Sequence, residues 1–263
     1  MKLLYLNPYG GNFGDEMGVD IARRLCDKRI RVKDLAIEKR FLGRSWVRRP
    51  GVMALGSILH YSRSGDVVWG TGINPFWQRK VRLEWDPQTL DIRAVRGPLT
   101  AEYLNEEYGL DLPLSPVYGD PGMLVARLFP ELGQGETARK YGITPHYLDM
   151  ETVQDHEDVM PPNRAWRDLV EFILGCEMIV SSSLHALIVA EAFKVPARWW
   201  HNENLPSSKT EGKFKYNDYY ASTDRSLDDF SETIEGAVRR GGKEPIKSFD
   251  FEKLESSFPR ELF

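Results

Sequence analysis

Short apolar segments alternate along this chain with amphipathic segments of helical length, and glycine-rich turns follow several of the apolar ones. Continuously apolar short segments are typical of strands buried on both faces of a parallel sheet, and parallel strands are usually joined by a helix. The alternation therefore predicts an α/β fold. The expected strands are residues 2–6, 51–55, 66–70, 91–95, 141–148, 177–181 and 196–200, and the expected helices are residues 15–25, 98–107, 163–175, 184–194 and 226–240.

A polar, glycine-containing stretch at residues 130–140 interrupts this alternation near the middle of the chain. Such a stretch is typical of an interdomain connection. We therefore expect two Rossmann-like domains that face a cleft, residues 1–130 and 131–240, with the tail 241–263 packed back on the first. Ligands of such folds bind beyond the carboxyl ends of the strands, which is where the glycine-rich turns fall.

Composition excludes several classes of protein. The 263-residue chain carries 35 Lys and Arg against 39 Asp and Glu, and this net charge of −4 disfavours a general nucleic-acid binder. The two cysteines have no metal-ligand spacing, which indicates a reducing compartment and predicts a cytoplasmic protein. No apolar run approaches the length of about 18 residues that a membrane-spanning helix needs.

Residues 23–49 stand apart, because they hold 11 Lys and Arg against three acids. One interpretation is a solvated basic face. The other is a peripheral contact with an anionic glycan, a lipid pyrophosphate or the inner face of the membrane.

The stretch Ser181-Ser182-Ser183-Leu184-His185 runs from an expected strand into an expected helix. The serines either cap the helix or, with its first N–H groups, help to bind an anion. On the second interpretation Ser182 and Ser183 are donor-binding residues. A bound anion would raise the pKa of His185 and keep its ring charged, which suits a proton donor.

The loops of the first half carry polar residues at the ends of expected strands. Arg96 follows the strand 91–95, where it either grips a carboxylate or phosphate or pairs with Glu102 or Asp91. Gly72 closes the turn Gly70-Thr71-Gly72 after the strand 66–70 and is expected on the acceptor side.

The loop Asn12-Phe13-Gly14-Asp15 matches neither common phosphate-binding glycine pattern, and Asp15 would repel an anion. We interpret it as a site for neutral hydroxyl groups, with Asn12 and Gly14 binding an acceptor and Asp15 as a general base. Asp120, in the turn Gly119–Gly122, is the second candidate base.

Residues 213–220 alternate lysine with aromatic side chains. Lys213 and Lys215 suit a phosphate, and the ring of Tyr219 suits stacking on a sugar; the alternative is a loop packed by its tyrosines. An anionic donor in the second half and a polyol acceptor in the first together indicate a group transferase.

Five motifs in order across the chain resemble the polysaccharide pyruvyltransferase family, in its bacterial exopolysaccharide branch. They are NFGD (12–15), GTG (70–72), VRGPLTAEYL (95–104), GDPG (119–122) and SSSLHALIVAEAFKVPARWW (181–200). The resemblance implies a compact fold of the glycosyltransferase-B type. It also implies phosphoenolpyruvate as donor, a free or lipid-linked saccharide as acceptor, and a pyruvate ketal and phosphate as products, without a cofactor or metal.

By position, the resemblance makes Arg96 the residue that holds the donor anion and His185 the catalytic histidine. Some relatives carry arginine where this chain has Ser183, which shifts anchoring of the donor to Lys213 or Lys215. The general base stays open between Asp15 and Asp120. Two other functions remain as alternatives: a glycosyltransferase that uses a nucleotide sugar, with Glu191 on its ribose, and a glycan-binding protein without catalysis.

Overall fold

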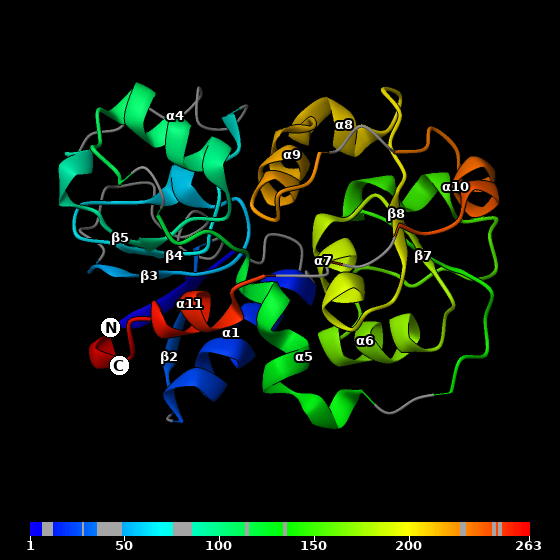
Figure 1. Cartoon of the computed structure of the whole chain (residues 1–263), viewed down its shortest axis with the longest axis horizontal. Helices are drawn as coiled ribbons and strands as arrows, with labels where there is room; N and C mark the ends of the chain where they lie inside the picture. Colours follow the sequence, from blue (N-terminus) through cyan, green and yellow to red (C-terminus); the bar gives the residue numbers. More distant parts are fainter. Residues whose placement is uncertain are drawn as a thin grey trace.

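The computed structural model describes residues 1–6, 13–27, 29–35, 49–75, 86–113, 116–133, 136–226, 230–243, 246 and 249–263. Asn12, the side chain of Asp15 and residues 36–48 of the basic stretch lie outside this description. The fold is α/β, as the alternation predicts, with two parallel sheets (Figure 1).

The first sheet has five parallel strands in the order β2-β1-β3-β4-β5. Its central strands are apolar on both faces, and Leu3, Met53 and Val68 are almost completely buried. The order reverses between β1 and β3, and ligands of open α/β sheets bind at such a switch point. The strands are β1 (Lys2–Tyr5), β2 (Arg31–Asp34), β3 (Gly51–Met53), β4 (Val67–Trp69) and β5 (Asp91–Ala94).

The second sheet has three parallel strands in the order β6-β7-β8. They are β6 (Gly142–Thr144), β7 (Ile179–Ser181) and β8 (Ala197–Trp199). The strand expected at 141–148 is shorter than predicted. The chain leaves the sheet at Pro145, and a 3₁₀ helix (Tyr147–Thr152) follows.

Helices form at the five expected places: α1 (Phe13–Cys26), α4 (Pro98–Tyr108), α6 (Trp166–Leu174), α7 (Leu184–Ala192) and α10 (Ile234–Arg240). α10 is shorter than the predicted 226–240, because Ser231 forms a β-bridge with Trp200 instead of a helical turn. Within the described ranges, four further helices were not predicted: α5 (Val125–Leu128), α8 (Pro206–Glu211), α9 (Phe214–Ala221) and α11 (Phe251–Ser256). α9 is made by the alternating lysine and aromatic stretch, whose Tyr216, Tyr219 and Tyr220 are all buried.

The halves share one hydrophobic core, which contains residues of α1 and β4 as well as of α6 and α7. α7 is apolar almost all round, as expected of a helix enclosed by protein. It packs against a 3₁₀ helix of the first half (Pro121–Leu124), where Met17 of α1 and Ile188 of α7 both closely approach Gly122.

The end of the chain lies against the first sheet, and both termini lie close together in Figure 1. The indole of Trp69 on β4 donates a hydrogen bond to the carbonyl of Leu254 in α11 (3.1 Å), and its ring meets the edge of Phe258. Arg260 donates to the carbonyl of Leu25 at the end of α1 (3.0 Å). None of the described helices is long and apolar enough to cross a membrane.

Candidate active site

His185 lies in the first turn of α7, where α7 meets the start of α1. Its ring packs so closely on Gly14 that a Cβ atom at position 14 would lie 1.9 Å from Nδ1. The ring of Phe13 meets the imidazole edge-on at 6.5 Å between centroids. No hydrogen bond links the half-buried imidazole to any residue in the described ranges. The structure thus brings His185 together with Gly14, with Nδ1 packed against the glycine and neither ring nitrogen hydrogen-bonded within the described residues.

The three serines before α7 do not cap it. Ser183 occupies the N-cap position without a side-chain hydrogen bond to the helix. Ser181 accepts from the Ser183 amide (2.9 Å) and donates to the carbonyl of Thr144 (2.5 Å). No acid lies in the first turn. The capping interpretation is therefore wrong, and the positive end of α7 is left open for an anion.

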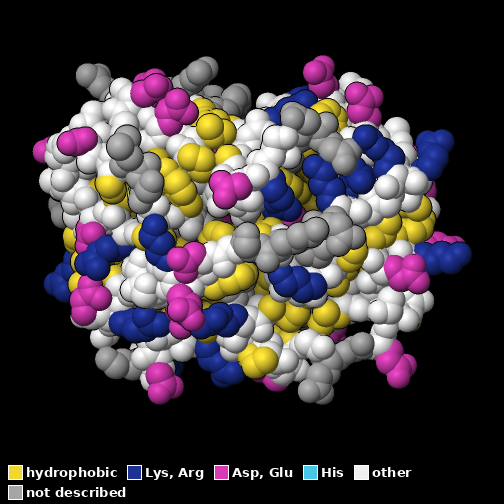
Figure 2. All heavy atoms as spheres, in the orientation of Figure 1, with side chains coloured by type: hydrophobic (Ala, Val, Ile, Leu, Met, Phe, Trp, Pro, Cys, Tyr) yellow, Lys and Arg dark blue, Asp and Glu magenta, His cyan; other side chains and the backbone are white. Residues whose placement is uncertain are grey.

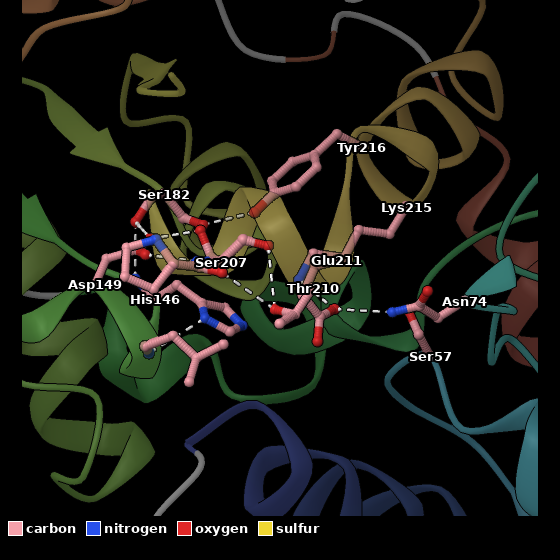
Figure 3. A network of polar contacts seen from close by, with 12 residues as sticks. Ser57, Asn74, His146, Asp149, Ser182, Ser207, Thr210, Glu211, Lys215 and Tyr216 are labelled. Carbon is pink, nitrogen blue, oxygen red and sulfur yellow. Dashed lines mark hydrogen bonds and ion pairs between the residues drawn. The ribbon is translucent and has the colours of Figure 1, made fainter. Parts of the chain in front are cut away.

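Ser182 is turned toward the interior. Its hydroxyl donates to Asp149 (2.7 Å) and accepts from the amide of His146 (2.9 Å), while its carbonyl accepts from the hydroxyl of Tyr216 (Figure 3). Only 1% of Ser182 is exposed. The side chain of Ser182 thus positions the loop instead of facing a ligand, whereas Ser183 makes no side-chain hydrogen bond within the described chain and stays a predicted donor ligand.

The charge state of His185 depends on whether an anion is bound. Burial, together with the nearby charges of Lys215 and Arg96, lowers the pKa of His185 from 6.5 to about 3. The ring is therefore neutral at physiological pH in the ligand-free protein. The expected charged ring requires a bound anion that offsets the two cations.

The two candidate lysines lie in different surroundings. Lys215 is buried and forms an ion pair with Glu211 (2.9 Å), close enough to His185 and to His146 for its charge to act on both rings. Lys213 is exposed, and its ammonium lies over the ring of Phe230, 4.3 Å from the centroid. Of the two, only Lys215 belongs to the surroundings of His185.

His146 joins this group, although the sequence interpretation missed it. It lies two residues beyond the end of β6, is 7% exposed, and has its pKa lowered well below the ordinary value by burial and by the charges of Lys215 and His185. The signal was present in the sequence, because a polar residue at the carboxyl end of a parallel strand is a candidate ligand. Extending the strand to residue 148 concealed it.

Arg96 is 1% exposed and forms a buried ion pair with Asp218 of α9 (3.0 Å). Its guanidinium also donates to the hydroxyl of Ser57 (2.6 Å) and to the carbonyl of Ile73 (3.3 Å). The predicted surface pairing with Glu102 or Asp91 is therefore wrong. Asp218 also accepts from the amide (2.9 Å) and hydroxyl (2.6 Å) of Thr100, so it caps α4 from the other half of the molecule.

Gly72 serves this arrangement, since a Cβ atom there would lie 2.2 Å from Cζ of Arg96. Its amide and carbonyl bond to the backbone of Gly56 and Leu59. The structure thus gives Gly72 a packing role beside Arg96. Tyr219 does not face a ligand either: it is completely buried, and its hydroxyl donates to Glu191 (2.6 Å). The prediction that Tyr219 binds the acceptor is therefore wrong.

Asp120 is completely buried next to the Arg96–Asp218 pair. One carboxylate oxygen accepts from the amide of Gly122 (2.9 Å), and Oδ2 has no hydrogen-bond partner within the described chain. Burial raises the pKa of Asp120 from 3.8 to about 6, against the opposing effects of the Gly122 amide and Arg96. A carboxyl group that titrates near neutrality suits a general base.

The raised pKa predicts a pH-dependent stability. The folded state holds the Asp120 proton more tightly than the unfolded state, so its stabilising contribution is complete below pH 3.8 and is lost as pH rises through about 6. Asp120→Asn lacks this loss. Between pH 4 and pH 8 the unfolding free energy of the wild type should therefore fall by up to about 3 kcal/mol relative to that of the variant. Denaturant titrations at both pH values measure the two unfolding free energies. The same difference between variant and wild type at both pH values would contradict the raised pKa of Asp120.

The basic stretch is described only in part. Arg23 pairs with Asp20 (3.1 Å), Arg24 pairs with Glu131 (3.3 Å), and β2 takes up residues 31–34. Acidic and basic side chains are interspersed over the face that Figure 2 presents. Among the described residues, no three His, Cys, Asp or Glu side chains gather as metal ligands.

Comparison with known proteins places these residues in context. The sequence model of the polysaccharide pyruvyl transferase family matches residues 38–199, more than half of the chain. The match includes the GTG, VRGPLTAEYL and GDPG motifs and the serine-histidine stretch. It does not include Gly14 or the α9 residues Lys215 and Asp218.

Two curated relatives match over part of their length. An uncharacterized protein of Acanthamoeba polyphaga mimivirus is 28% identical over 174 residues, 63% of this chain and 58% of the relative. The succinoglycan biosynthesis protein ExoV of Rhizobium meliloti (strain 1021) is 32% identical over 143 residues, 51% of this chain and 41% of the relative. The chain thus spans about half the length of these relatives.

Proposed function

Because the chain belongs to the polysaccharide pyruvyl transferase family, we propose that it transfers the pyruvyl group of phosphoenolpyruvate to two hydroxyls of a sugar. The acceptor is a saccharide, free or lipid-linked, of an exopolysaccharide or its precursor, and phosphate is released. The observation that carries the proposal is His185, whose ring makes no hydrogen bond in the described chain, close to two buried cations and at an open helix terminus.

The donor side has the charge that phosphoenolpyruvate requires. Lys215, Arg96 and the uncapped start of α7 lie on this side, and no acid stands in the first turn of α7. Lys215 pairs with Glu211 through one hydrogen bond, which leaves its other ammonium protons for a donor oxygen. Arg96 is already paired with Asp218, so we assign it a long-range electrostatic role. Lys215 is the cation assigned to the donor in place of the arginine absent at Ser183.

The proposed chemistry balances without another reactant. His185, protonated once the donor is bound, gives a proton to the methylene carbon, which becomes a methyl group. A sugar hydroxyl attacks C2 while Asp120 or Asp15 takes its proton. The bond from C2 to the phosphate oxygen breaks, and the second hydroxyl closes the ketal. Of the two hydroxyl protons, one restores His185 and the other leaves with hydrogen phosphate.

Binding of the donor should therefore draw a proton from solution. The three negative charges of phosphoenolpyruvate oppose the cations that hold the pKa of His185 near 3, so the pKa rises and the ring takes up as much as about one proton at pH 7. Calorimetric titrations in buffers of different ionisation enthalpy measure this uptake. Equal heats in all buffers would contradict it, and His185→Gln should abolish the uptake.

The glycosyltransferase alternative loses the residue proposed for it. Glu191 is 3% exposed and holds a bidentate ion pair with Arg225 (2.8 and 2.9 Å) and the hydroxyl of Tyr219, so it does not face a ribose. A glycan-binding protein without catalysis would not need an unpartnered histidine close to buried cations.

Acceptor-dependent release of phosphate from phosphoenolpyruvate tests the proposal. We expect release only in the presence of particular lipid-linked or nucleotide-linked sugars, together with thermal stabilisation by phosphoenolpyruvate alone. Stabilisation by a nucleotide sugar without any effect of phosphoenolpyruvate would overturn the proposal in favour of glycosyl transfer. Saccharide binding that survives in His185→Ala without turnover in the wild type would favour the glycan-binding alternative.

We also propose that the two sheets are Rossmann-like halves of a glycosyltransferase-B-type fold, with residues 1–130 on the acceptor side and 131–240 on the donor side. The parallel sheets and the position of His185 between the starts of α1 and α7 support this division. The reaction is assigned to the cytoplasm, with the basic stretch at 23–49 as the part that would meet a lipid-linked acceptor.

A further inference from the structure

His146 occupies a fixed position at the donor side. Its amide donates to the hydroxyl of Ser182 (2.9 Å), immediately before α7, and its ring lies against that of Tyr147 at 4.4 Å between centroids. The side chain is more than nine-tenths buried, with 7% exposed. These contacts hold the ring beside the open start of α7.

The contacts of the ring also determine which nitrogen carries the proton. Nδ1 accepts from the amide of Leu148 (3.4 Å), so in the neutral ring the proton resides on Nε2. Within the described chain no hydrogen bond reaches Nε2. A neutral imidazole in this tautomer is a hydrogen-bond donor at Nε2. Nε2 is not fully enclosed by the described residues, so a ligand can take the place of water as its partner.

The groups around His146 select an anionic ligand. Lys215 and His185 both act electrostatically on the ring, and Lys215 is held by Glu211, which also accepts from Asn74 of the first half (3.3 Å; Figure 3). The acid nearest in the chain, Asp149, already accepts from Ser182 and from both the amide and hydroxyl of Ser207. Its charge is therefore compensated by three donors.

We propose that His146 is a second ligand-binding histidine, which donates from Nε2 to an oxygen of the phosphate group of the donor. The inference rests on the proposed function for the identity of that donor. Lys215 supplies charge to the same phosphate, and His185 stays the residue that acts on the methylene carbon. His146 thereby fixes the orientation of the donor, with the phosphate at His146 and Lys215 and the methylene carbon at His185.

Two substitutions separate binding from a merely structural role. Asn reproduces the acceptor at Nδ1 and lacks the distal donor, whereas Gln reproduces a donor near Nε2. His146→Asn should keep the melting temperature near that of the wild type. It should weaken binding of inorganic phosphate and raise KM for phosphoenolpyruvate by about 10- to 100-fold, the range expected for loss of a hydrogen bond to a charged group. His146→Gln should recover most of both, and pyruvate, which lacks phosphate, should bind equally to all three proteins.

Calorimetry with inorganic phosphate and steady-state kinetics provide the readouts, and His156→Asn, at a histidine on a loop outside the site, is the control. Unchanged phosphate binding in His146→Asn would overturn the inference, as would equal losses in both variants with a fall in melting temperature. Absence of phosphate binding by the wild type would also overturn it. Phosphate binding that depends on His146, without release of phosphate from phosphoenolpyruvate, would refute the proposed function and support this inference.

Discussion

Replacement of His185 by alanine should lower the turnover number by about 10²- to 10⁴-fold, the usual contribution of a positioned acid–base group. The imidazole is the one predicted catalytic side chain that the structure places free of hydrogen bonds, within the described chain, and near Lys215 and Arg96. Initial rates of phosphate release with saturating phosphoenolpyruvate measure the effect on kcat. His185→Gln should be similarly impaired, because an amide does not exchange protons near neutral pH.

The control for this experiment is His156→Ala, at a half-buried histidine on the loop after the 3₁₀ helix Tyr147–Thr152. It should retain wild-type turnover. Melting temperatures of the two alanine variants show whether a loss of rate reflects unfolding. Full activity in a folded His185→Ala protein would remove His185 from the mechanism.

Loss of the Asp218 carboxylate should produce the largest change in stability. Asp218→Ala leaves Arg96 as an unpaired charge that is 1% exposed, and it also removes the acceptor for the amide and hydroxyl of Thr100. Removing one partner of a buried ion pair typically costs about 3–5 kcal/mol of unfolding free energy. Denaturant titration at pH 7 measures this cost.

The matched control is a surface pair. Arg23 and Asp20 lie 3.1 Å apart with side chains 47% and 28% exposed, so Arg23→Ala should change the unfolding free energy by less than about 1 kcal/mol. A combined replacement of Arg96 and Asp218 by apolar residues should destabilise less than Asp218→Ala, because no buried charge remains. A cost below about 1 kcal/mol for Asp218→Ala would show that Arg96 finds another partner.

The strands predicted from continuously apolar segments appear in the structure. The strand that was not predicted, β2, is polar. β2 has the sequence Arg-Val-Lys-Asp and pairs with β1 alone, at the edge of the sheet, where polar side chains can reach solvent. Its charges had suggested a solvated or anion-binding face. Hydrophobic pattern therefore identifies the strands that are rich in apolar residues, including β6 and β8 at sheet edges, and misses the polar edge strand β2.

The helix α9 shows how two patterns compete in one segment. Lys213 and Lys215 alternate with aromatic residues at the period of a strand, whereas Tyr216, Tyr219 and Tyr220 have the i, i+3, i+4 spacing of a helix. The helical pattern is the one that the core selects, because it buries three tyrosines on one side. Tyr219 was therefore assigned to a sugar when it belongs to the interior.

Those features of the candidate site that lie within a single stretch of sequence were predictable. His185 and the start of α7 follow from one stretch of sequence, and Gly14 follows from the motif at residues 12–15. The neutral state of His185 was not predictable, because it depends on Lys215 and Arg96, which come from distant segments. The partner of Arg96 was hidden for the same reason, since Asp218 lies 122 residues away in the sequence.

The carboxylate of Asp218 also bears on whether the halves of this molecule are separable modules. A fragment that ends near residue 130 would lack Asp218. Its Arg96 would then have no carboxylate partner, and α4 would lose the side chain that caps it. It would also expose the face that α7 covers at Gly122. Such a fragment should be obtained folded only when the complementary fragment is supplied in trans.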